Sequence, residues 1–191
     1  CRLVSSDKEQ AEAEVIEVVR CPAEPSVKVT VLCGLPKGDK TDYIIQKCVE
    51  AGACEIMFFM SDRCVAKPDK PEKKLERWQR IAEEAAKQSG RGIIPTVETP
   101  ISWKAALARF EQEYTLLCYE GGGAPIGTLV TPADTAVSLV VGPEGGFDPA
   151  EVEAVTAVGG KIATLGPRIL RCETAPIAAL AVLMERSGNM E

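Results

Sequence analysis

The stretch AVSLVVGPEGGFDPAE, residues 136–151, decides the fold class because it joins a strand, a glycine-rich turn and a helix start. Residues 136–141 form an apolar run that is typical of a strand buried on both faces. Gly142 to Gly146 follow this run directly. In residues 148–151, an Asp, a Pro and a Glu match the N-cap, the first helical position and the capping-box partner of a helix. The stretch therefore predicts a strand–loop–helix unit of an α/β protein.

Strand and helix patterns alternate on both sides of this unit. We expect strands at residues 27–33, 55–60, 93–97, 115–119, 136–141 and 161–165, and helices at residues 39–51, 72–88, 102–113, 149–158 and 174–186. In the first helix, Tyr43, Ile44, Cys48 and Val49 are expected to face the core. Alternating β and α segments predict a mainly parallel sheet with helices on both faces.

A domain boundary is indicated near the beginning of the sequence. Val15 to Val19 predict a short strand. Cys21 to Pro25 follow it and contain two prolines, which is typical of a linker. We therefore expect residues 1–22 to be the end of a preceding domain and residues 23–191 to form the main domain.

The residue types that are missing limit the possible chemistry. The chain has no histidine, and none of its eight cysteines belongs to a C-x-x-C pair. This excludes zinc sites of standard spacing and nucleophiles paired with histidine, so we expect no metal. We interpret the cysteines as reduced thiols of a cytoplasmic protein, with an organelle such as a plastid left open. No apolar run is long enough to cross a bilayer, and we expect no membrane partner.

The distribution of charge leaves nucleic-acid binding open. The net charge of −6 argues against a nucleic-acid partner. However, residues 63–91 contain nine Lys or Arg and five Asp or Glu. A basic stretch on an acidic protein is compatible with RNA contact, and it is equally compatible with a solvated helix face.

Three Gly- or Pro-containing loops follow predicted strands in the C-terminal half: Glu120 to Gly127, Gly142 to Phe147 and Gly166 to Thr174. In open α/β sheets, ligands bind beyond the carboxyl ends of the strands. The loops lack the Lys-Ser/Thr of a P-loop and the G-x-G-x-x-G spacing of a dinucleotide fold. Because Glu144 would repel phosphate, the middle loop favours a ligand with a neutral or cationic part. Ordinary βα turns are the alternative interpretation.

Two of these segments carry a family resemblance. Gly142–Phe147, followed by Leu165–Ala175, closely resembles the paired signatures of the ribosomal RNA small subunit methyltransferase E family. Lys37–Lys40 and Gln88–Arg91 also match in order and spacing, and the resemblance covers about residues 27 to 186. It implies a SPOUT-type fold with a C-terminal deep trefoil knot, a homodimer, and a PUA-like RNA-binding domain of which residues 1–22 would be the remnant. It also implies that S-adenosyl-L-methionine is used to methylate N3 of a uridine in 16S, or small-subunit, ribosomal RNA.

The resemblance also implies roles for individual residues. The cofactor pocket would be lined by Leu117, Tyr119, Glu120, Gly142, Glu144, Gly145, Gly146, Leu165, Gly166, Ile169 and Leu170. Arg171 and Glu173 would be catalytic: they would orient the uracil or assist its deprotonation. Gln88, Arg91 and Arg168 would contact RNA. The sequence departs from the family pattern at Cys172, where members usually carry Thr or Ser.

The sequence leaves three alternative functions open. One is a related knotted methyltransferase that acts on tRNA or on a ribose 2′-hydroxyl, against which the signature at residues 168–175 argues. Another is a non-catalytic RNA-binding or ribosome-assembly module with a relic pocket, which would not bind S-adenosylmethionine. The third is a nucleotide enzyme of the Rossmann type, which the loop spacing disfavours.

Overall fold

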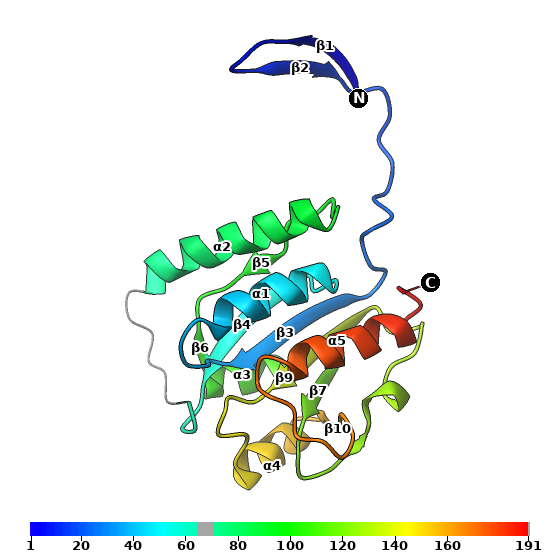
Figure 1. Ribbon diagram of the computed structural model, residues 1–191. Helices are drawn as coiled ribbons and strands as arrows, with labels where there is room; N and C mark the ends of the chain where they lie inside the picture. The colour runs from blue at the N-terminus through cyan, green and yellow to red at the C-terminus, as the bar shows by residue number, and fades with distance from the viewer. Residues whose placement is uncertain (65–70, 191) are drawn as a thin grey trace.

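A hairpin and an α/β unit make up the computed structural model, which describes residues 1–64 and 71–190. The hairpin consists of β1 (Arg2–Ser6) and β2 (Ala11–Glu14), which pair antiparallel, and every residue of both strands is exposed. It stands away from the α/β unit, to which an extended segment connects it (Figure 1).

The N-terminal strand is therefore not where we predicted it. Residues 15–19 carry no strand and are exposed, so the prediction of a strand from Val15 to Val19 is wrong. The missed signal is Asp7, whose Oδ1 accepts hydrogen bonds from the backbone N–H of Glu9 at 2.8 Å and of Gln10 at 2.9 Å. Such an Asx turn reverses the chain and pairs the residues on either side of it.

The α/β unit is built on one sheet in which all paired strands run parallel. Its strand order is β5 (Thr96–Val97), β4 (Glu55–Met60), β3 (Lys28–Gly34), β9 (Ala136–Val141), β7 (Thr115–Cys118), β10 (Lys161–Thr164) and β8 (Ala124–Pro125), with β6 (Ile101–Ser102) also beside β4. The predicted mainly parallel sheet is confirmed.

Helices cover both faces of the sheet, as predicted (Figure 1). One face carries α1 (Lys40–Glu50), α2 (Pro71–Gln88), α5 (Ala175–Arg186) and the 3-10 turn η1 (Ile126–Thr128), and the other carries α3 (Trp103–Phe110) and α4 (Pro149–Ala157). The capping box at Asp148 is confirmed: Asp148 caps the first turn of α4, and the Glu151 side chain accepts from the Asp148 N–H at 2.8 Å. None of the helices in residues 1–64 and 71–190 has the length and apolar character that a membrane crossing requires.

Neighbouring residues of each central strand feed two separate cores. In β4, Phe58 packs against Trp78 of α2, with ring centroids 5.2 Å apart. The next residue, Phe59, points to the opposite face and packs against Trp103 of α3, with centroids 5.1 Å apart. Side chains alternate across a strand, so a strand buried on both faces needs apolar residues at every position. This explains the unbroken apolar run at residues 56–60 of β4.

Two further predictions of detail are wrong. Tyr43 was expected in the core, but it is 49% exposed, while Ile44 and Ile45 fill that face of α1. The strand predicted at 93–97 is reduced to Thr96–Val97. The physical reason is that the backbone N–H of Ile93 donates to a carboxylate oxygen of Glu24 at 3.0 Å, so it is not available to a neighbouring strand.

The position of β10 matters for the site. Although it follows β9 in the chain, it lies between β7 and β8, which are consecutive. The loop from Tyr119 to Gly123 that joins β7 to β8 therefore passes close to β10. The N–H of Tyr119 donates to the carbonyl of Ala163 at 2.9 Å, and a Cβ on Gly123 would lie 2.6 Å from the carbonyl oxygen of Ile162. The C-terminal segment is thus packed tightly against an earlier loop.

Candidate active site

A cavity of about 410 Å³ opens at the carboxyl ends of β7, β9 and β10. This volume lies within the range of small-molecule sites, and the place agrees with the rule for parallel α/β sheets. The three loops that follow these strands meet here, the first of them through Glu120. Of the residues expected to bind the cofactor, the wall of the cavity contains Tyr119, Glu120, Gly142, Glu144, Gly145, Gly146, Leu165, Gly166, Ile169 and Leu170.

Leu117 is the exception. Its side chain is fully buried and belongs to the core beneath α3 and α4, so the expectation that it lines the pocket is wrong. Its neighbour Cys118 lines the cavity instead, because successive side chains of a strand point to opposite faces. Thr164 and Cys172 also line the cavity and were not expected there. The alternation along β7 would have identified Cys118, had the face of the sheet been known.

Glu144 lines the cavity, but one of its oxygens is already occupied. Its Oε1 accepts from the Lys40 ammonium at 2.8 Å and from the Lys37 backbone N–H at 3.1 Å. Burial acts to raise the pKa of Glu144, but these hydrogen bonds outweigh burial and hold the pKa below its usual value. Glu144 is therefore ionised at neutral pH. The wall thus places a carboxylate, paired with the Lys40 ammonium, among side chains of both charges, because Glu120, Arg168 and Arg171 also line the cavity.

Arg63, just beyond β4, supports the loop that follows β9. Its Nη1 donates to the carbonyl of Gly145 at 3.0 Å, and its Nη2 contacts Oδ2 of Asp148 at 3.0 Å. A Cβ on Gly145 would lie 3.2 Å from atoms of Arg63. The loop between β9 and α4 is thus held from both sides, by Arg63 and by Lys40. Neither residue was expected at the site, although Lys40 belongs to the segment Lys37–Lys40 that resembles the family.

The two residues expected to be catalytic lie at the start of α5 but do not share the cavity wall. Arg171 lines the cavity, and its carbonyl accepts the N–H groups of Thr174 and Ala175 at 2.8 and 2.9 Å. Glu173 is not part of the wall. Its Oε2 lies 3.4 Å from the Lys40 ammonium and accepts from the Cys172 thiol at 3.2 Å. Both residues nevertheless belong to the short segment that closes the cavity.

The three residues expected to contact RNA are dispersed. Arg168 lies at the cavity, and Gln88 is exposed at the end of α2. The side chain of Arg91 is only 3% exposed, so it is not available to a phosphate. The guanidinium contacts Glu24 at 2.8 Å and donates to the carbonyls of Val49, at 3.2 Å, and Ala53. The expected RNA-facing position of Arg91 is therefore corrected to a structural one.

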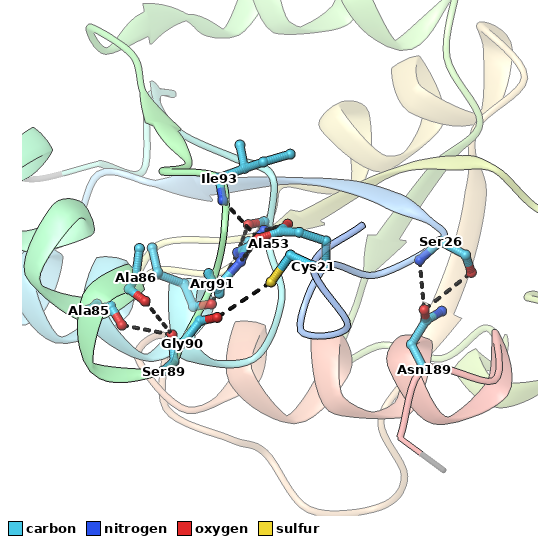
Figure 2. A network of polar contacts seen from close by, with 12 residues as sticks. Cys21, Ser26, Ala53, Ala85, Ala86, Ser89, Gly90, Arg91, Ile93 and Asn189 are labelled. Atoms are coloured by element: carbon cyan, nitrogen blue, oxygen red, sulfur yellow. Dashed lines mark hydrogen bonds and ion pairs between the residues drawn. The ribbon is translucent and has the colours of Figure 1, made fainter. Parts of the chain in front are cut away.

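Arg91 is part of a polar network that connects residues 21–26, which precede β3, to the α/β unit (Figure 2). The thiol of Cys21 contacts the carbonyl of Gly90 at 3.5 Å, and the N–H of Ser26 donates to Oδ1 of Asn189 at 2.7 Å. Residues 21–26 are thus bound to the end of α2 and to the C-terminal segment. The residues described contain no cluster of three or more Cys, Asp or Glu side chains suited to a metal ion.

The comparisons with known proteins show the family to which the chain belongs. Residues 23–184 match a protein family described as an RNA methyltransferase domain. A Ribosomal RNA small subunit methyltransferase E from Bacillus subtilis (strain 168) is 40% identical over 193 residues, covering 96% of this chain and 75% of the relative. The chain belongs to this methyltransferase E family. A second Ribosomal RNA small subunit methyltransferase E, from Mesomycoplasma hyopneumoniae (strain 232), is 37% identical. The match covers 88% of this chain and 74% of that relative.

A solved structure of a family member resembles the fold of this chain. The Ribosomal RNA small subunit methyltransferase E from Neisseria gonorrhoeae, bound to S-adenosyl methionine, superimposes with a TM-score of 0.85 at 34% identity. The match covers 96% of this chain and 76% of that one. The α/β fold that carries the cavity is thus the fold of a methyltransferase that binds this cofactor.

Proposed function

We propose that the protein transfers a methyl group from S-adenosyl-L-methionine to N3 of a uridine in small-subunit ribosomal RNA. The observation that carries the proposal is the cavity at the carboxyl ends of β7, β9 and β10, lined by the loops that follow these strands, in a methyltransferase fold. The names of the relatives support the RNA substrate, and the cofactor in the Neisseria structure supports the methyl donor. The sequence signature at residues 168–175 supports the uridine N3 position.

The residues of the cavity fit this cofactor. Gly142, Gly145 and Gly146 expose backbone groups at close range. Leu165, Ile169 and Leu170 offer an apolar surface to an adenine ring, and Glu120 and Glu144 offer negative charge to a cationic methyl donor. When bound, S-adenosylmethionine supplies an electrophilic methyl group on a sulfonium.

The chain itself must then handle one proton. The uracil N3–H bond breaks, its electron pair forms the new bond to the methyl carbon, and the sulfur keeps the electrons of the broken S–C bond. We assign Glu173 as the proton acceptor and Arg171 as the group that orients the uracil. A carboxylate of lowered pKa is a weak acceptor. The Arg171 guanidinium must therefore also stabilise the negative charge that develops on the uracil oxygens.

Recognition of the RNA requires that the uridine leaves its stacked position to enter the cavity. We propose Arg168, at the cavity, and Gln88, on the surface of α2, as RNA contacts. The exposed Lys74, Arg77, Arg80 and Lys87 of α2 support this assignment, because phosphate attracts positive charge. The lysines at 67, 70 and 73 lie outside the described residues or side chains.

We propose that the C-terminal segment forms a deep trefoil knot and that two copies of the chain form a homodimer. The insertion of β10 between the consecutive strands β7 and β8 supports threading of this kind. Ile169 is 84% exposed at the rim of the cavity, which supports a partner subunit there. Light scattering during size-exclusion chromatography measures the mass directly.

We further propose that residues 1–22 and residues 23–191 belong to different domains and that the protein acts in the cytoplasm. The exposed hairpin supports the first part, because an isolated two-stranded hairpin is at best marginally stable. We propose that the hairpin is the remnant of a PUA-like RNA-binding domain. A ribosomal RNA substrate supports the cytoplasm as the place of action.

The proposed function is tested by two measurements on the same preparation. Calorimetric titration with S-adenosylmethionine should give one saturable site, which a relic binding module would lack. Incubation with labelled cofactor and unmodified small-subunit RNA, followed by mass spectrometry of the nucleosides, should give N3-methyluridine. Label in tRNA, or on a ribose 2′-hydroxyl, would instead identify the related knotted methyltransferases.

A further inference from the structure

Lys40 joins three segments that are far apart in the sequence. It is the first residue of α1, and its ammonium lies 2.8 Å from Oε1 of Glu144 in the loop after β9. The same nitrogen lies 3.4 Å from Oε2 of Glu173 and 3.6 Å from Sγ of Cys172, just before α5. One cation therefore contacts the loop that lines the cavity and the residue that we assign as proton acceptor.

Partial burial strengthens the electrostatic interactions between Lys40, Glu144 and Glu173. The side chains of Lys40, Glu144 and Glu173 are 30%, 33% and 26% exposed, so solvent screens them less than surface ion pairs. Two carboxylates at hydrogen-bond or ion-pair distance from one nitrogen repel each other when that nitrogen is removed. The pKa of one carboxyl would then rise, because a nearby like charge disfavours ionisation.

The position of Lys40 on its helix also argues against a role in helix stability. A positive charge at the first residue of a helix is unfavourable, because the N-terminal end of the helix dipole is positive. Lys40 nevertheless stands there and turns its ammonium toward the two carboxylates. Its hydrogen bond to Glu144 raises the pKa of Lys40 above the ordinary value, so the residue is a permanent cation.

Resting on the proposed function, we propose that Lys40 is a positioning residue for methyl transfer. It holds the carboxylate of Glu173 in a fixed place, and it ties the cofactor loop to the same point through Glu144. The titratable groups around its ammonium are Glu144, Glu173 and Cys172. Burial, with the contact to Glu173, raises the pKa of the Cys172 thiol to about 11. This thiol stays neutral at pH 7, so the ionisable partners are the two carboxylates.

The test compares Lys40→Met and Lys40→Arg with Lys47→Met as the matched control. Lys47 lies on the same helix and contacts Glu50 at 2.8 Å, whereas Lys40 contacts Glu144 and Glu173. In the full chain, Lys40→Met is expected to lower kcat about 100-fold, the usual effect of a misplaced catalytic group. KM for S-adenosylmethionine should change much less, Lys40→Arg should recover part of kcat, and Lys47→Met should behave as the wild type.

Two readouts separate positioning from simple support of the fold. A backbone hydrogen bond is the main cause that lowers the pKa of Glu173, and Lys40 lowers it further. In Lys40→Met, the acidic limb of the kcat profile should therefore move to higher pH, because the part contributed by the cation is lost. In addition, the double variant Lys40→Met/Glu173→Gln should lose less kcat than the product of the two single losses. The reason is that one residue acts through the other. Multiplying losses, an unmoved acidic limb, or a kcat close to the wild type would overturn the proposal. Absence of cofactor binding and methyl transfer in the wild type would overturn the proposed function itself.

Discussion

Replacement of Arg91 by methionine should destabilise the fold, although the side chain lies outside the cavity. Methionine keeps most of the volume, so the change removes charge and hydrogen bonds without leaving a large hole. The carboxylate of Glu24, 13% exposed, would keep the N–H of Ile93 as a donor but lose its cationic partner. The carbonyls of Val49 and Ala53 would lose a donor as well.

The magnitude follows from this list of losses. Breaking a buried ion pair by removing one partner costs about 3–5 kcal/mol. With the urea dependence that is usual for domains, this lowers the unfolding midpoint by roughly 1–2 M. Arg77→Met is the matched control: Arg77 pairs with Asp42 but is 62% exposed, so its loss should cost less than about 1 kcal/mol.

The pH dependence gives the experiment a second signature. Burial acts to raise the pKa of Glu24, but the contacts with Arg91 and backbone N–H groups outweigh it and lower the pKa. A carboxyl whose pKa is lowered by folding stabilises the folded state above its unfolded pKa, about 4.3. This contribution is lost as the pH falls through the folded pKa. The difference between wild type and Arg91→Met should therefore shrink in acid.

The assay is urea unfolding followed by circular dichroism at pH 7 and at pH values below 4. Glu24→Gln should recover part of the loss in the Arg91→Met background, since a buried neutral amide costs less than an unpaired carboxylate. If Arg91→Met unfolds at the same urea concentration as the wild type and loses only RNA affinity, the structural role assigned to Arg91 is refuted.

Two further changes probe the loops around the cavity. Gly123→Ala places a side chain at φ +136° with its Cβ 2.6 Å from the carbonyl oxygen of Ile162. We expect the free energy of unfolding, measured in urea, to fall by about 1–3 kcal/mol. An unchanged unfolding midpoint would show that the loop can move away from β10. Arg63→Met removes the contacts to Gly145 and Asp148. Calorimetry should then find that the affinity for S-adenosylmethionine is about fivefold to tenfold lower, which corresponds to a binding free energy weaker by roughly 1–1.4 kcal/mol. Because Arg63 is 44% exposed, thermal stability should hardly change, and equal losses of stability and affinity would argue against loop support.

Local sequence patterns predicted the elements well where the signal is local. The apolar run at Ala136–Val141 became β9 with the same bounds, and the capping box fixed the start of α4 at Pro149. Patterns failed where a distant partner decides the outcome. Residues 93 and 94 are apolar and β-branched, yet they form no strand because Glu24 captures the N–H of Ile93. Likewise, the periodicity of residues 39–51 could not show that Ile45 rather than Tyr43 faces the core.

The sequence patterns alone determined the α/β class and the loops that follow β7, β9 and β10. These follow from contacts within single strands, turns and helix ends, which neighbouring residues specify. The resemblance to the family, and no local pattern, indicated the residues of the cavity wall, and it did not indicate Cys118, Thr164 or Cys172. The tertiary structure decided the order of the strands, and with it the insertion of β10 between β7 and β8. That order brings Lys40 to Glu144, 104 residues away, and buries Arg91 against Glu24, 67 residues away. Such pairs depend on how the whole sheet is assembled, and no local pattern encodes them.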